Sequence, residues 1–200
     1  MTDRTNAAIQ AFFGPRAAEW EARTAKDVPQ IERAVAECGH SRGATILDLG
    51  CGTGRAVPPL RRAVGPAGVI VAVDITVEMI QAAHAAGRAP LAHFIVADVH
   101  RLPFGGGRAD AIHAQGILPH LADPATALRE WHRVARPGAL LAVFHAIGRV
   151  ALAAIHRRTP SDDDVLAGGR LRRLLDSAGW ALDSIDDAPE RFLALARRRS

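Results

Sequence analysis

Three glycines at alternate positions follow a short apolar run in the first half of the chain. The run, residues 44–49, contains Asp48 and predicts a buried strand that leads directly into the turn 50–54, Gly-Cys-Gly-Thr-Gly. Glycine lacks a Cβ atom, so such a turn adopts positive φ angles at little cost and brings main-chain N–H groups close to a ligand. N–H groups there and at the start of the following helix favour a negatively charged group. The alternative is a tight strand-to-helix turn without a ligand.

An aspartate stands at the end of the next predicted strand. The β-branched run 69–73 ends in Asp74, about 20 residues beyond the glycine turn, where a carboxylate accepts hydrogen bonds from the two ribose hydroxyls of a nucleoside. Ile75 follows it and is placed to pack against a base. Asp74 has an alternative role as the cap of a helix predicted over 76–86. We favour ribose binding, and one carboxylate can serve both roles.

Polar residues also follow the strand predicted within 110–120. In open α/β sheets, ligands lie outside the carboxyl ends of the strands, so we expect His113, Gln115 and His120 near a substrate. Imidazole titrates near neutral pH and can act as a base, with His120 as the first candidate, followed by His113 and His145. The alternative for each histidine is a packing or hydrogen-bonding role.

The elements that position these residues alternate along the chain. From Ser41 onward, apolar runs typical of strands alternate with helical patterns, which indicates an α/β fold with a mostly parallel sheet covered on both faces. Strands are predicted at 44–49, 69–73, 92–96, within 110–120, at 139–144, 180–185 and 192–196, and helices at 55–64, 76–86, from 123 and around 171–175. We expect the acidic stretch 161–164 to cap the last helix.

Residues 1–40 are predicted to be helical, with a break at residues 14–15, Gly-Pro. Phe12, Phe13 and Trp20 either wall a substrate pocket or anchor these helices to the sheet. The second interpretation is favoured, because aromatic residues at helical spacing usually belong to a core.

The order of these motifs resembles that of the class I S-adenosylmethionine (SAM) dependent methyltransferases. The resemblance is carried by the Leu47-Asp48-Leu49 strand end with its glycine turn, Asp74, Asp98, the strand at Asp110 and Pro137-Gly138. It covers nearly the whole chain from Ala44 and is strongest toward the ubiquinone/menaquinone-biosynthesis methyltransferases and related small-molecule enzymes. One departure is Ala139, where the family has a second glycine, which puts the geometry of that turn in question.

The resemblance implies a three-layer Rossmann-like methyltransferase fold. Its sheet is expected to be mostly parallel and seven-stranded, with an antiparallel C-terminal hairpin. It implies one methyltransferase domain over residues 1–200, in which an N-terminal helical cap segment, 1–40, precedes a SAM-binding core, 41–200.

The resemblance also implies roles for single residues. In this family an acid after the third strand faces the adenine amino group and the next N–H reaches a ring nitrogen, and Asp98 and Val99 hold those positions. A carboxylate there accepts from the exocyclic amine of adenine, whereas guanine presents a carbonyl. The alternative for Asp98 is a turn of its own loop. Gln115 lines the methionine end of the cofactor, and His120 falls near the acceptor. The implied cofactor-binding residues are Asp48, Gly50, Cys51, Gly52, Thr53, Gly54, Asp74, Ile75, Asp98, Val99 and Gln115.

The implied reaction is an in-line displacement. An oxygen, nitrogen, carbon or sulfur of a small-molecule acceptor, such as one of secondary metabolism, attacks the methyl group of the sulfonium and leaves S-adenosylhomocysteine (SAH). Alignment and exclusion of water carry most of this catalysis, so a base is optional. A catalytically inactive SAM-binding regulatory or partner protein is the alternative.

Two further enzyme classes are disfavoured. A nicotinamide-dependent oxidoreductase lacks support because the third glycine of the G-x-G-x-x-G spacing is missing. Nucleobase methylation is disfavoured because residues 113–116, His-Ala-Gln-Gly, do not resemble the Pro-Pro tetrad of amine-methylating enzymes, and neither cysteine follows a proline.

Composition and net charge narrow the kinds of protein that this sequence can encode. The net charge of the 200 residues is only +4, which is too small to indicate specific binding of nucleic acid. No apolar run reaches the ~18 residues of a membrane span, and residues 1–10 lack the apolar centre of a signal peptide. The two cysteines and nine histidines show neither a disulfide framework nor metal-ligand spacing. We therefore expect a cytoplasmic monomer or homodimer without a metal ion.

Overall fold

The computed structural model describes residues 4–200, so the first three residues of the predicted cap segment lie outside the described residues. Its strands are β1 Thr45–Leu49, β2 Val69–Asp74, β3 His93–Val96, β4 Ala109–Gln115, β5 Ala135–His145, β6 Trp180–Ala188 and β7 Arg191–Arg198. Its helices are α1 Asn6–Phe13, α2 Ala17–Thr24, α3 Val28–Glu37, α4 Val57–Val64, α5 Val77–Ala85, α6 Pro124–Val134, α7 Arg149–Ile155 and α8 Gly168–Ser177. Within the described residues, no helix is both long enough and apolar enough to cross a membrane.

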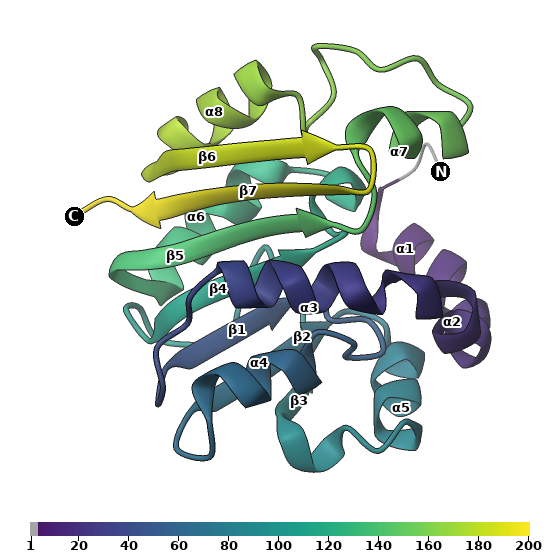
Figure 1. Ribbon diagram of the computed structural model, residues 1–200, viewed down its shortest axis with the longest axis vertical. Helices are drawn as coiled ribbons and strands as arrows, with labels where there is room; N and C mark the ends of the chain where they lie inside the picture. The colour runs from purple at the N-terminus through teal and green to yellow at the C-terminus, as the bar shows by residue number, and fades with distance from the viewer. Residues whose placement is uncertain (1–3) are drawn as a thin grey trace.

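The strands form one sheet in the order β3-β2-β1-β4-β5-β7-β6 (Figure 1). The five strands from β3 to β5 pair in parallel. β7 runs antiparallel to both β5 and β6, which confirms the predicted C-terminal hairpin. The strand order reverses direction between β1 and β4, and the carboxyl ends of such a pair flank the crevice in which open α/β sheets bind ligands.

Helices cover both faces of the sheet, which confirms the three-layer α/β prediction (Figure 1). On the face of α3 and α4, the buried residues include Ile46, Leu60 and Ile70. On the face of α6 and α8, the largest buried side chains are Trp131 and Trp180. Both indole N–H groups donate to backbone carbonyl oxygens, at 3.1 Å and 3.0 Å, so these buried donors are satisfied.

The cap helices α1 and α2 lie at the carboxyl ends of the parallel strands (Figure 1). Residues 14–16 do not end the helical segment but form a 3₁₀ turn that joins the two helices. Pro15 fits there because the first positions of a helical turn do not need its missing N–H. The cap therefore lies at the carboxyl ends of the parallel strands, where open α/β sheets bind ligands in a crevice.

The predicted cap at 161–164 is wrong. α8 begins only at Gly168, and Ala167 occupies its N-cap position. Asp164 instead closes its own turn, since its carboxylate accepts from the N–H of Ser161 at 3.0 Å and pairs with Arg158 at 3.1 Å. Local bonds of this kind compete with the start of a helix.

Residues 136–138, predicted as a turn before the fifth strand, lie within β5, and the pairing of β5 with β4 is irregular there. Gly138 carries the positive φ angle there, 76°, and Arg157 is the only non-glycine residue of the described chain with a positive φ. A second glycine is therefore not required by the backbone at position 139.

Candidate functional site

The glycine turn between β1 and α4 has positive φ angles at all three glycines, 69° at Gly50, 54° at Gly52 and 77° at Gly54. A Cβ atom at Gly50 would lie 2.8 Å from the side chain of Ile117, and one at Gly54 would lie 3.0 Å from the ring of Phe94. A Cβ atom at Gly52 would meet nothing within 4 Å. Protein packing thus explains two of the glycines, whereas the open space at Gly52 is what a ligand against the main chain requires.

Asp74, at the end of β2, holds the glycine turn. One of its carboxylate oxygens accepts from the N–H of Gly52 and the other from the N–H of Thr76, both at 2.8 Å. The negative group expected at the amides of the turn is therefore this carboxylate, which also takes the alternative role at the start of α5. Burial raises the pKa of Asp74 and the two N–H groups oppose that shift. Each oxygen keeps a lone pair for a further donor.

Asp98, in the loop after β3, is in contact with the cap. One carboxylate oxygen accepts from the side-chain amide of Asn6 at 2.8 Å, and the other accepts from the N–H of His100 at 2.9 Å. Partial burial acts to raise the pKa of Asp98, but the bonds from His100 and Asn6 outweigh it and the pKa lies below its usual value. In the same helix as Asn6, the side-chain amide of Gln10 donates to the carbonyl oxygen of Ile75 at 2.8 Å.

Asp48, on β1, is fully buried without a partner. It has no exposed surface, and no described residue hydrogen-bonds to either carboxylate oxygen. Burial, with a smaller contribution from the charge of Asp74, raises the pKa of Asp48 to about 7. An unpaired buried carboxyl group is costly and rare, so its position next to the glycine turn points to a ligand that supplies a donor.

His113 is the register neighbour of Asp48 on β4 and is also fully buried. Its ring stacks on Phe144 with 6.1 Å between centroids. Burial lowers the pKa of His113 to about 4, and the side chain of Gln115 offsets part of that shift without reaching hydrogen-bonding geometry. His113 lies within the sheet layer with no surface open to an acceptor, which does not favour a role as base.

His120 lies beside the cap, at the end of the 3₁₀ turn that follows β4. Its ring meets the edge of Phe13 at 5.4 Å, and Phe13 meets Trp20 at 5.4 Å. Burial and then the charge of His145 lower the pKa of His120 to about 4. The imidazole is therefore neutral at neutral pH and has a lone pair that can accept a proton. Phe13, the last residue of α1, therefore joins the cap to His120 by a ring contact.

Sequence patterns did not reveal Glu21, which joins α2 to the glycine turn. Its carboxylate accepts from the hydroxyl of Thr53 and forms a two-pronged ion pair with Arg88, with both N–O distances at 2.8 Å. Arg88 also donates to the carbonyl oxygen of Thr53 at 2.8 Å. Glu21 and Arg88 are 67 positions apart in the sequence. A pair that forms only through tertiary packing has no local sequence motif that predicts it.

Several polar groups around the crevice have no partner in the part of the chain that the structure describes. They include the carboxylate of Asp48, the amide oxygen of Gln115, the N–H of Val99 and both ring nitrogens of His113. Asp74 and Asp98 add carboxylate oxygens with lone pairs to spare. This set fits a ligand that brings an ammonium group, hydroxyl groups and a purine with an exocyclic amine, which are the parts of SAM.

Comparisons with known proteins agree with this geometry. The model of a methyltransferase domain matches residues 47–143. The chain is 28% identical to malonyl-[acyl-carrier protein] O-methyltransferase of Pseudescherichia vulneris over 164 residues, 82% of this chain and 62% of that protein. It is 34% identical to the ubiquinone/menaquinone biosynthesis C-methyltransferase UbiE of Hahella chejuensis over 110 residues, 53% of this chain and 44% of that protein.

A SAM dependent methyltransferase from Aquifex aeolicus has a similar crystal structure, with a TM-score of 0.71 and 23% identity over 96% of this chain and 98% of that chain. At that identity the likeness shows the fold. The chain spans less than two thirds of the length of the two curated relatives named above. The matched domain contains the glycine turn, Asp48, Asp74, Asp98 and His120 in the order expected of the family. Residues 47–143 therefore match a methyltransferase domain, and the chain is similar to SAM-dependent methyltransferases in its sequence motifs and in its fold.

Proposed function

We propose that this chain transfers the methyl group of SAM to a small-molecule acceptor by in-line displacement, leaving SAH. The observation that carries the proposal is the open space at Gly52, next to the carboxylate of Asp74, in a turn whose other two glycines are explained by packing. SAM supplies a methyl group on a sulfonium, so the protein has mainly to align the acceptor and exclude water.

The proposed binding residues divide by the chemistry that they offer. Asp74 accepts from ribose hydroxyls, Asp98 accepts from the adenine amine, and Val99 donates to a ring nitrogen, with Ile75 against the base. Asp48 and Gln115 accept from the ammonium group of the methionine end. The main chain of the turn formed by Gly50, Cys51, Gly52, Thr53 and Gly54 encloses the cofactor.

We propose His120 as the base where an acceptor has to lose a proton. The support is its neutral imidazole beside the aromatic wall of Phe13 and Trp20. His145, at the end of β5, has a buried ring nitrogen without a partner and stands as the second choice. His113 stands third, because its ring is stacked on Phe144 within the sheet layer.

Two measurements test the function. Calorimetric titration with SAM and with SAH measures cofactor binding, and transfer of tritium from methyl-labelled SAM to a panel of phenols, hydroquinones, amines and thiols measures turnover. Binding with transfer supports the proposal. Binding without transfer across the panel and a broader metabolite extract favours the SAM-binding partner protein, and binding of NAD in place of SAM contradicts both.

Replacing Asp74 with asparagine is expected to weaken SAH binding about thirtyfold, because one charge-assisted hydrogen bond of about 2 kcal/mol is lost at the ribose. The matched control is Asp110→Asn. Asp110 likewise accepts from a backbone N–H, that of Thr45 at 2.8 Å, but at the opposite end of the sheet. The variant D110N should keep the affinity of the unaltered chain, and equal losses in the two variants would contradict the ribose role.

Replacing His120 with alanine is expected to lower kcat about a hundredfold for an acceptor that must be deprotonated, the lower end of what general-base catalysis contributes. SAH affinity should change little, since the proposed role is toward the acceptor. His93→Ala, on the exposed side of the edge strand β3, is the control and should retain full turnover. Full turnover of H120A at every pH would remove His120 from the mechanism.

The remaining proposals concern organisation and surroundings. We propose that residues 1–40 act as the cap of a single methyltransferase domain, supported by the contacts of Asn6, Gln10 and Glu21 with the crevice. A cytoplasmic location is supported by the two cysteines, which are both free and buried and so suit a reducing compartment. We propose a monomer or homodimer. No nucleic-acid partner is proposed.

A further inference from the structure

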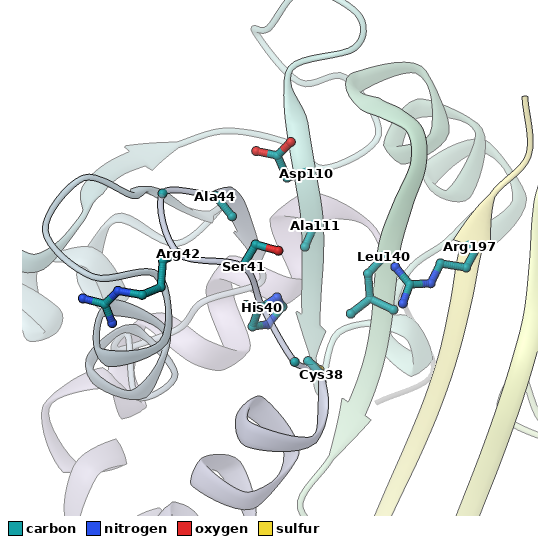
Figure 2. Close-up of a pocket in the computed structure, with 11 residues that line it drawn as sticks. Cys38, His40, Ser41, Arg42, Ala44, Asp110, Ala111, Leu140 and Arg197 are labelled. Carbon is teal, nitrogen blue, oxygen red and sulfur yellow. The ribbon is translucent and has the colours of Figure 1, made fainter.

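A second cavity lies at the end of the sheet opposite the crevice. Its volume is about 290 Å³, close to the lower limit of ~300 Å³ for pockets that hold small ligands. It is lined by the loop that leaves α3, the first residues of β4, one residue of β5 and the end of β7 (Figure 2). Because β7 is antiparallel, its last residues lie beside the amino ends of β4 and β5. No residue of the proposed cofactor site lines this cavity.

The cavity has an apolar floor and a polar wall. Ala111 and Leu140 form the floor with the buried Cys38. Figure 2 shows the side chain of Arg197 extending from β7 over Leu140 toward the loop that carries Ser41. Burial raises the pKa of Cys38 to about 12, so this thiol contributes an apolar surface and not a charge.

Donors on this wall have spare capacity. The Nε2 atom of His40 is buried without a partner and donates in one of the two neutral tautomers. The main-chain N–H groups of residues 40–42 donate to no acceptor among the residues that the structure describes. Arg197 has one ion-pair partner, Asp183 at 3.5 Å, and both side chains are about half exposed. A guanidinium has five N–H donors, so most of those on Arg197 are open to a ligand.

The carboxylate on the same wall is already paired. Asp110 is the carboxylate that lines the cavity. One of its oxygens accepts from the N–H of Thr45 at 2.8 Å, and the other pairs with Arg136 at 2.5 Å. The wall therefore offers a surplus of donors and the charge of Arg197, which favours an anion that can take two parallel N–H bonds.

We propose that this cavity binds a small carboxylate whose apolar body rests on Ala111 and Leu140 and whose oxygens pair with Arg197. A site of this kind is separate from methyl transfer and does not depend on the function proposed above.

Benzoate is the probe, with benzyl alcohol as its uncharged counterpart of similar shape. Titration of the full chain, followed by calorimetry and by amide chemical shifts in NMR, should give saturable benzoate binding that shifts residues 38–44. Benzyl alcohol is expected to bind at least about tenfold more weakly, because the ion pair with the guanidinium is absent.

Three variants locate the site. Arg197→Gln is expected to weaken benzoate binding at least about tenfold. Arg199→Gln should leave it unchanged, since Arg199 pairs with Asp176 and does not line the cavity. Asp183→Asn removes the competing carboxylate and should tighten binding, a result that a merely destabilised sheet edge does not produce.

Several results would overturn the proposal. They are equal binding of benzoate and benzyl alcohol, equal affinity of folded R197Q, or absence of shifts in residues 38–44. Competition between benzoate and SAH would place benzoate in the crevice and also contradict it. SAH binding is measured in a separate titration. Binding of SAH without binding of benzoate would contradict only this inference, and binding of benzoate without binding of SAH would contradict only the proposed function.

Discussion

Replacing Gly52 with alanine is expected to weaken SAH binding about a thousandfold while the chain stays folded. The added methyl group meets no protein atom within 4 Å, so it projects into the space left for the ligand. A ligand held against the main chain must then move away and lose its contacts with the turn, and a thousandfold loss corresponds to about 4 kcal/mol. Calorimetric titration with SAH measures the loss.

The same substitution also strains the backbone, because Gly52 has a φ of 54°. That strain costs about 1–2 kcal/mol of folding stability for a residue with a Cβ atom. Gly107→Ala is the matched control, since Gly107 has a φ of 65° and a Cβ atom there also meets nothing within 4 Å. Gly107 lies before β4, at the end of the sheet away from the crevice.

Urea unfolding should therefore show similar losses of stability in G52A and G107A, with the loss of SAH affinity confined to G52A. If both variants bind SAH as tightly as the unaltered chain, the open space at Gly52 is not the cofactor site. If both lose affinity equally, the effect comes from backbone strain.

Replacing Asp48 with asparagine is expected to stabilise the unliganded chain by about 4 kcal/mol at mildly alkaline pH. The folded state holds the pKa of Asp48 at about 7, above the ordinary value of 3.8, because the carboxyl group is buried. Below the ordinary value both states are protonated, so burial of Asp48 makes no pH-dependent contribution to stability. As the pH rises from there to about 7, the unfolded state loses its proton while the folded state keeps it, so stability falls. Asparagine has no proton to lose and avoids that fall.

The measurement is urea unfolding of the unaltered chain and D48N at several pH values. The difference between them should grow by about 3 kcal/mol between about pH 5 and about pH 8. Other titrating groups, such as His113, are present in both proteins, so their contributions cancel in the difference between the two free energies of unfolding. Asp176→Asn is the control, because Asp176 is partly exposed and paired with Arg199, and its difference should stay small over the same range. A D48N difference that does not change with pH would show that Asp48 keeps its ordinary pKa.

The proposed role of Asp48 predicts that D48N has opposite effects on stability and on SAH binding. D48N should bind SAH more weakly, since the proposed acceptor for the ammonium group becomes a neutral amide. Residues at binding sites often carry such a cost in the unliganded state.

The sequence by itself determined the order of strands and helices and the positions of the main motifs. The period of apolar residues, the β-branched runs and the glycines are local signals, so they predicted the strands of the sheet and placed Asp48, Asp74 and Asp98 at the carboxyl ends of β1, β2 and β3. Those ends meet at one edge of a parallel sheet whatever the detailed packing is. The hairpin of β6 and β7 came from family resemblance and is confirmed by their pairing.

Tertiary structure alone decided which side chains meet. Asn6 reaches Asp98 across 92 positions and Glu21 reaches Arg88 across 67. Such pairs depend on how the cap helices pack on the sheet, and no sequence period encodes that. Packing also separated His113 from His120. His113 lies within β4, where its ring is buried in the sheet layer. The chain turns after β4, so His120 faces the cap. The free space at Gly52 and the cavity beside Arg197 are likewise products of packing, because an empty volume belongs to all the elements around it.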